Sequence, residues 1–144
     1  MTVIAYRNGI MAADSCVSQG SMAVGTMPKI VKTPGGWLAG GAGLAKTIRE
    51  FLKWADKDFA PAHRPKAKAA DLSGIAVSPE GVVFFYEDEW DAFTIDGPYH
   101  AIGSGGDAAL IAMDMGASAK RAVKAACKRI HGCAEPIVIL TLKA

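Results

Sequence analysis

The chain has 144 residues, of which 51% are hydrophobic and 21% charged, and its formal net charge is +2. This length and composition indicate one globular domain with a substantial core and exclude an intrinsically disordered chain. The small net charge gives no indication of a polyanion, so nucleic acid is not expected as a partner. No apolar run reaches the roughly 18 residues of a membrane-spanning helix, and no membrane association is expected.

Three cysteines, Cys16, Cys127 and Cys133, form an odd set without a CxxC pair. The chain also lacks a secretory type of apolar segment, so we expect reduced thiols and a cytoplasmic location. Cys127 falls on the apolar face of a predicted helix, where it would pack as a small hydrophobic side chain. Cys133 falls in a predicted loop.

Two short apolar segments flank Asn8-Gly9 near the start of the chain. Asn-Gly is typical of a type I′ turn, because both central residues of that turn need a positive φ. The pattern therefore predicts an antiparallel hairpin that pairs residues 3–7 with residues 10–13. A two-residue turn places Val3 opposite Asp14 and Thr2 opposite Ser15.

Two further hairpins and a helix are predicted in the middle of the chain. Turn residues at 34–36 and 78–81 join 29–33 to 37–40 and 75–77 to 82–86, respectively. Apolar residues at helical spacing between the two hairpins predict a helix over residues 44–56. Residues 58–70 contain Pro61 and Pro65 and are expected to form a solvated connection with at most one helical turn.

The last third of the chain is predicted to hold two helices and a strand. The helices cover residues 107–115 and the stretch from the N-cap Ser118 to Gly132. The continuous apolar run 137–142 is typical of a central strand that is covered on both faces. Two sheets packed face to face with helices outside would bury every apolar face, which predicts an α+β protein with four layers.

Thr2 is the first candidate for chemistry. If Met1 is removed, this residue carries a hydroxyl and a free α-amine. An α-amine has a pKa of about 8, so part of it is neutral at pH 7 and can accept the proton of the hydroxyl. The alternative is that position 2 is an ordinary strand residue.

Four segments carry a family resemblance. They are Ala12-Ala13-Asp14-Ser15, Met27-Pro28-Lys29-Ile30-Val31, Leu38-Ala39-Gly40-Gly41-Ala42-Gly43 and Ala101-Ile102-Gly103-Ser104-Gly105-Gly106. In this order, and together with Thr2, they resemble the proteasome β-subunit superfamily, and within it the bacterial protease subunit HslV and short phage-type relatives. The resemblance implies a four-layer αββα sandwich of the N-terminal nucleophile hydrolase type, as a single domain over residues 1–144.

The resemblance also implies a mechanism, in which a threonine peptidase forms an acyl-enzyme on Thr2. Lys29 would lower the pKa of the Thr2 amine and hydroxyl, and Asp14 would hold Lys29 by an ion pair. The backbone N–H of Gly40 would face the developing oxyanion, and the hydroxyl of Ser104 would orient a proton near the terminal amine. An exposed Asp14–Lys29 pair of little energetic consequence is the alternative.

The same matching implies an apolar specificity pocket and a set of partners. Val17, Met27, Val31 and Leu38 would line the pocket, which predicts cleavage after hydrophobic residues. A peptide or unfolded protein is the expected substrate, a homo-oligomeric ring is the expected assembly, and an AAA+ ATPase partner is left open. No metal or other cofactor is expected, because the histidines show no ligand spacing such as HExxH.

The chain departs from the family pattern in two places. Many members have an aspartate near the position of Ile130, where this chain has none, and His131 or Cys133 is the candidate replacement. The first hairpin is also shorter than the family's, and counting through its turn puts Met1 at the position of the nucleophile. A slightly different turn, or a shorter reach from Thr2, would restore Thr2 to that position.

Two other functions stay open at this point. One is a catalytically inactive subunit that keeps the fold and forms the ring as a scaffold. The other is an amidohydrolase of the same fold that acts on a small amide, since only the shape of the pocket separates this activity from peptide hydrolysis.

Overall fold

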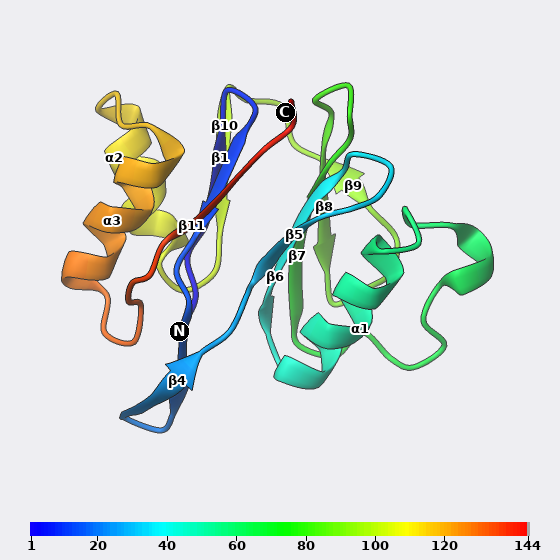
Figure 1. Ribbon diagram of the computed structural model, residues 1–144, viewed down its shortest axis with the longest axis horizontal. Coiled ribbons are helices and arrows are strands. Elements are labelled where there is room, and N and C mark those ends of the chain that lie inside the picture. Colours follow the sequence, from blue (N-terminus) through cyan, green and yellow to red (C-terminus); the bar gives the residue numbers. More distant parts are fainter. Residues whose placement is uncertain (144) are drawn as a thin grey trace.

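The computed structural model describes residues 1–143, and Figure 1 shows the arrangement of their helices and strands. The strands are β1 (Ile4–Arg7), β2 (Ile10–Ala13), β3 (Cys16–Gln19), β4 (Met22–Thr26), β5 (Ile30–Lys32), β6 (Leu38–Gly43), β7 (Leu72–Val77), β8 (Val83–Glu87), β9 (Phe93–Thr94), β10 (Tyr99–Ile102) and β11 (Val138–Thr141). The helices are α1 (Ala45–Ala55), α2 (Gly106–Asp114) and α3 (Ala119–Arg129), with a 3-10 turn at Pro61–His63.

The strands form three antiparallel sheets. The first sheet has the order β10-β1-β2-β11, the second has the order β5-β6-β7-β8-β9, and β3 pairs with β4 alone. Apolar side chains of β1, β2 and β10 form one cluster with side chains of β5 to β8, so the first two sheets contact each other through these side chains. The chain is therefore a mixed α and β protein with antiparallel sheets.

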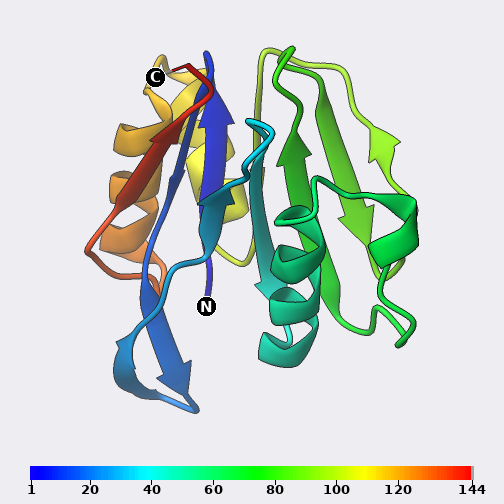
Figure 2. The ribbon, with the colours of Figure 1, turned by 45° about the vertical axis from the view of Figure 1, so that its right-hand side comes forward.

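The helices lie on the outer faces of the two large sheets (Figures 1 and 2). Beneath α2 and α3 the core consists mainly of small residues, six of them alanines, which allow the helices to approach the first sheet closely. Beneath α1 the core is aromatic, with Phe51, Trp54 and Tyr86 at its centre. Phe51 and Tyr86 pack edge to face with ring centroids 4.9 Å apart.

The first hairpin forms as the sequence predicts. Asn8 and Gly9 have φ values of 53° and 76°, as a type I′ turn requires. The register pairs Ile4 with Ala13 and Arg7 with Ile10. The pairing continues beyond the strands, since the Asp14 N–H donates to the Val3 carbonyl at 3.2 Å.

The predicted helices and the other two hairpins are also present. The first helix covers Ala45–Ala55 and the second Gly106–Asp114, each within a residue or two of its predicted limits. The Ser118 hydroxyl caps α3 by accepting a hydrogen bond of 3.2 Å from the Arg121 N–H. At the turn after β7, the Gly81 N–H donates to the Ser78 carbonyl at 2.8 Å.

The prediction of a central strand near the end of the chain is wrong. Strand β11 lies at the edge of the first sheet, paired with β2 alone, and its residues alternate between half-buried and exposed. Ile139 is 39% exposed, so the apolar run does not mark a strand covered on both faces. Strands β3, β4, β9 and β10 are not predicted, because each has at most five residues and contains a polar residue or a glycine.

Within residues 1–143, no helix combines the length and the apolar composition that crossing a membrane requires.

Candidate functional site

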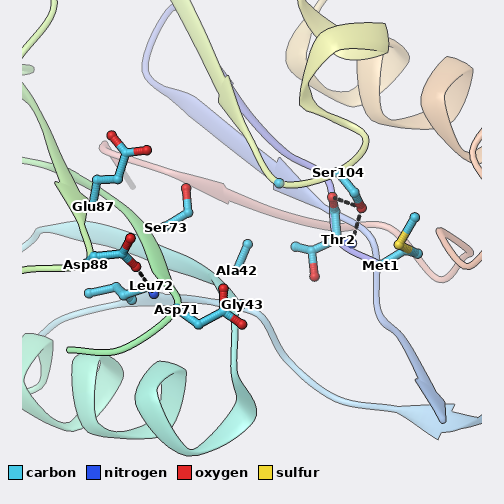
Figure 3. A pocket seen from close by; sticks show the side chains of 11 residues that line it. Met1, Thr2, Ala42, Gly43, Asp71, Leu72, Ser73, Glu87, Asp88 and Ser104 are labelled. Carbon is cyan, nitrogen blue, oxygen red and sulfur yellow. Dashed lines mark hydrogen bonds between the residues drawn. The ribbon is translucent and has the colours of Figure 1, made fainter. Parts of the chain in front are cut away.

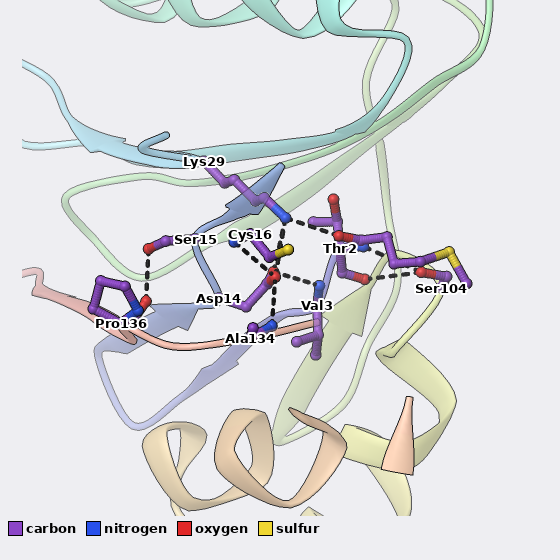
Figure 4. Close-up of polar contacts among 10 residues, drawn as sticks. Thr2, Val3, Asp14, Ser15, Cys16, Lys29, Ser104, Ala134 and Pro136 are labelled. Carbon is purple, nitrogen blue, oxygen red and sulfur yellow. Dashed lines mark hydrogen bonds and ion pairs between the residues drawn. The ribbon is translucent and has the colours of Figure 1, made fainter. Parts of the chain in front are cut away.

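Asp14 is the most buried charged residue near the start of the chain, with no exposed surface. Its carboxylate accepts hydrogen bonds from the backbone N–H groups of Val3 at 3.0 Å and of Cys16 and Ala134 at 3.3 Å each. The Lys29 ammonium lies 3.0 and 3.1 Å from its two oxygens (Figure 4). Burial of this carboxylate is compensated by three backbone donors and one cation.

Lys29 extends from this pair to the first peptide bond of the chain. Its side chain is 6% exposed, and its Nζ donates a hydrogen bond of 2.8 Å to the Met1 carbonyl oxygen. The predicted ion pair with Asp14 is therefore present, and the alternative of an exposed pair is wrong. A buried ammonium held in this position places positive charge beside the Met1–Thr2 peptide.

Thr2 is held through its own backbone by the turn between β10 and α2. Its N–H donates to the Ser104 hydroxyl at 3.1 Å, and its carbonyl accepts from the Gly105 N–H at 2.9 Å. The Ser104 hydroxyl also lies 3.4 Å from the Thr2 carbonyl oxygen. The structure thus brings Thr2, Asp14, Lys29 and Ser104 together from four separate parts of the chain (Figure 4).

Two glycines of the same turn permit this close approach. Gly103 has a φ of +92°, and a Cβ at this residue would lie 2.3 Å from the Thr2 carbonyl oxygen. A Cβ on Gly105 would lie 2.7 Å from Cβ of Val3. Both positions therefore require glycine. The motif 101–106 indicated the turn, but sequence reasoning assigned no role to these two glycines.

The register of the first hairpin agrees with the count made from its turn, and the polar contacts around it converge on the Met1–Thr2 peptide. The nitrogen that contacts Ser104 belongs to Thr2, and the carbonyl that contacts Lys29 belongs to Met1. Removal of Met1 would leave the α-amine of Thr2 at the Ser104 hydroxyl. Assignment of the nucleophile to Thr2 rather than to position 1 stays a prediction.

Two cavities meet at Met1 and Thr2. The first has a volume of about 490 Å³ and lies on the Ser104 side, with Asp71, Glu87 and Asp88 among its lining residues (Figure 3). The second has a volume of about 290 Å³ and lies on the Lys29 side. Gly43 and Asp71 line both cavities, so the two form a continuous groove past Thr2.

The predicted apolar pocket is present in part. Val17 and Met27 line the second cavity, together with Leu44 and Ile48, which are not among the predicted pocket residues. Leu38 is fully buried in the cluster between the two large sheets and does not line this cavity. Val31 is half-buried and packs against the aromatic cluster beneath α1.

Gly40 lies away from both cavities, in the interior of β6. It pairs with Ile30 in β5 and with Ile75 in β7, so strands flank its backbone on both sides. A Cβ at this position would lie 2.7 Å from Cγ2 of Ile30 and 2.9 Å from Cδ1 of Ile4. Packing between the sheets accounts for this glycine, and its oxyanion role stays a prediction.

The loop after α3 contributes packing to the site. Cys133 is 4% exposed and belongs to the core cluster that contains Val3, and burial raises the pKa of its thiol. A buried, protonated thiol is a poor replacement for an aspartate. A Cβ on Gly132 would lie 2.7 Å from Cγ of Met1, so this loop packs directly against the first residue. His131 is exposed.

No three His, Cys, Asp or Glu side chains converge in a way that could hold a metal ion anywhere in residues 1–143.

No protein-family model matches the sequence, and the comparison with curated proteins gives no match. Among solved structures, the fold is similar to Thiobacillus denitrificans BPH, with a TM-score of 0.64 and 16% identity over 99% of this chain and 98% of that chain. It is also similar to Thiobacillus denitrificans BPH in complex with epoxomicin, with a TM-score of 0.65, 16% identity and 99% of both chains covered. At this identity the likeness shows a shared fold.

Proposed function

We propose that the chain is an N-terminal threonine peptidase of the proteasome and HslV type, folded as a single four-layer αββα sandwich over residues 1–144. One observation carries this proposal. A buried ammonium, Lys29, is fixed by Asp14 and directed at the Met1–Thr2 peptide, where removal of Met1 would generate an amine beside a hydroxyl. Burying an ion pair is costly, so its position at this peptide argues for a role in chemistry.

In the proposed reaction, the Thr2 amine accepts the proton of the Thr2 hydroxyl while its oxygen attacks the substrate carbonyl. Lys29 lowers the pKa of both groups through its charge, and Ser104 orients the amine by the contact of 3.1 Å. The amine then gives its proton to the leaving nitrogen, which departs and leaves an ester on Thr2. Water hydrolyses the ester and restores the hydroxyl. A backbone N–H beside Gly43, which lines both cavities, is the proposed oxyanion donor.

The neighbouring structures support the same function. Thiobacillus denitrificans BPH shares the fold over nearly its whole length and binds epoxomicin, a proteasome inhibitor. A protein of this fold is a candidate for peptide binding. The second cavity, lined by Val17, Met27 and Ile48, favours cleavage after a hydrophobic residue.

A homo-oligomeric ring is the proposed assembly, with an AAA+ ATPase as a partner that feeds it. The hairpin β3–β4 extends beyond both large sheets (Figure 1) and carries Met22 and Val24, which are 68% and 53% exposed. Exposed apolar residues on a projecting hairpin support association with another subunit.

Variants of Thr2 and Lys29 test the proposal. Hydrolysis of blocked peptides with an apolar residue before the cleaved bond is measured for the wild type, Thr2→Ala, Thr2→Ser and Lys29→Ala. We expect Thr2→Ala to lower kcat at least about 1000-fold, Lys29→Ala to do nearly the same, and Thr2→Ser to retain activity. Size-exclusion chromatography checks that the assembly is unchanged.

The other functions give different results in the same experiment. Undiminished hydrolysis by Thr2→Ala would rule out the mechanism. A wild type that hydrolyses simple amides but no peptide would be a small-amide amidohydrolase. A wild type that assembles and keeps Met1 but hydrolyses neither would be an inactive scaffold.

A further inference from the structure

The wall of the first cavity that faces Thr2 carries three acidic residues. Asp71 precedes β7, and Glu87 and Asp88 lie at the end of β8 (Figure 3). Their backbones are fixed, because Glu87 pairs with Ser73 in the sheet and the Asp88 N–H donates to the Leu72 carbonyl at 2.9 Å. The Asp71 carbonyl accepts from the Leu44 N–H at 3.1 Å. Backbone hydrogen bonds therefore hold the three residues on one wall of the cleft.

These carboxylates have no cationic partner within the described chain. The ion pairs among residues 1–143 are Lys29–Asp14 and Arg64–Asp91, and no Lys, Arg or His lines the cavity. One oxygen of Asp88 accepts from the Leu72 N–H at 3.0 Å, and all three residues are exposed. Like charges gathered in a concave surface raise the local concentration of cations.

The proposed reaction assigns this cavity to one side of the cleaved bond. The amine that protonates the leaving nitrogen is at Thr2, where its hydrogen bond goes to Ser104. Ser104 lines the first cavity and does not line the second. The leaving segment of the substrate must therefore lie in the first cavity, and the acyl segment in the apolar second cavity.

We propose that the first cavity selects substrates with a lysine or arginine in the leaving segment, directly after the cleaved bond. This inference rests on the proposed peptidase function and adds the substrate class. The enzyme then cleaves between an apolar residue, held near Val17 and Met27, and a cationic residue, held by Asp71 and Glu87. The cavity of about 490 Å³ accommodates a long cationic side chain.

The test compares fluorogenic peptides that differ only in the residue after the cleaved leucine, which is Lys, Gln or Glu. We expect kcat/KM to be roughly tenfold higher for Lys than for Glu, with Gln between them. The double variant Asp71→Asn/Glu87→Gln should reduce the ratio of Lys to Glu severalfold, with Asp88 as the remaining carboxylate. The matched control is Glu89→Gln, which neutralises an exposed neighbour outside the cavity and should keep the ratio.

A binding experiment separates failure of this inference from failure of the peptidase function. Fluorescein-labelled versions of the three peptides are titrated into the full-length Thr2→Ala protein, and their Kd values are measured by anisotropy. Cleavage without a preference for Lys, or a preference that the double variant does not reduce, overturns the cationic specificity. Absence of cleavage with tighter binding of Lys that the double variant loses overturns the peptidase and supports the cation site. Absence of both cleavage and tighter binding of the Lys peptide overturns the peptidase function and the cation site together.

Discussion

Carboxylates lie on both sides of Thr2, and the fold uses them differently. Asp14 has no exposed surface and is saturated by Lys29 and three backbone donors. Asp71 and Glu87 are exposed on the wall of an open cavity and have no cationic partner among residues 1–143. A saturated carboxylate fixes the protein's own groups, whereas unpaired carboxylates on a cavity wall are available to a ligand.

The largest expected effect on stability comes from removing the negative charge of Asp14, the buried carboxylate. Asp14→Asn keeps the shape of the side chain but leaves the Lys29 ammonium buried without a counter-charge, which should cost about 3–5 kcal/mol of stability. Urea denaturation measures the loss. The matched change at an exposed carboxylate of the first cavity, Glu87→Gln, should alter stability by less than about 0.5 kcal/mol. Equal effects of the two substitutions would contradict the distinction.

A smaller effect should follow from moving the backbone of Thr2 without changing any charge. Gly103→Ala places a Cβ against the Thr2 carbonyl at a φ of +92°, which should cost about 3 kcal/mol. Gly81 has a similar φ of +90° and no atom within 4 Å of an added Cβ, so Gly81→Ala should cost only about 1 kcal/mol. Urea denaturation of both variants isolates the contact with Thr2. A smaller loss for Gly103→Ala would show that Thr2 is not held as described.

Salt should screen the exposed carboxylates of the first cavity more strongly than the buried Lys29–Asp14 pair. Raising the ionic strength from 0.05 to 0.5 M should reduce the preference for Lys over Glu in the leaving segment by roughly threefold, because the cavity carboxylates are exposed to solvent. The rate of reaction with epoxomicin should change less than twofold, because the Lys29–Asp14 pair is shielded from solvent. If the rate of reaction with epoxomicin fell as much as the preference for Lys, the Lys29–Asp14 pair would be screened as strongly as the cavity carboxylates, which would contradict the distinction.

The smallest effect concerns His100, a buried polar residue that packs against Phe85 with ring centroids 5.2 Å apart. Burial lowers the pKa of His100 below 6.5, so the unfolded chain binds more protons than the folded chain below that pH. The free energy of unfolding should therefore fall modestly between pH 7 and pH 5. His100→Gln should reduce this fall relative to the wild type. The same pH dependence in His100→Gln and in the wild type would contradict the assignment.

Local signals in the sequence were sufficient for much of the fold. The positive φ values of Asn8-Gly9, the cap at Ser118 and the helical spacing of Ile48 and Phe51 are properties of neighbouring residues. Strand β11 was misplaced because its apolar run describes the side chains but not the number of neighbouring strands. Hairpin β3–β4 is not predicted, because β4 is exposed throughout and has no alternation between buried and exposed residues.

The candidate site was predicted less completely, for a related reason. The contacts of Lys29 with Asp14 and of Thr2 with Ser104 were anticipated from the family resemblance. Gly40 was expected at the cleft, although its environment is set by packing of Ile4 and Ile30 from two different sheets. The acidic wall was not anticipated, because Asp71 lies far in sequence from Glu87 and Asp88, and only the pairing of β7 with β8 brings them together.

Intact-protein mass spectrometry before and after treatment with epoxomicin tests the central claim most directly. The account predicts that the purified protein lacks Met1, that it gains the mass of one epoxomicin molecule, and that peptide mapping places the adduct on Thr2. The Thr2→Ala variant should gain no mass under the same conditions. A protein that retains Met1 and remains unmodified, or an adduct located on a cysteine, would contradict the account.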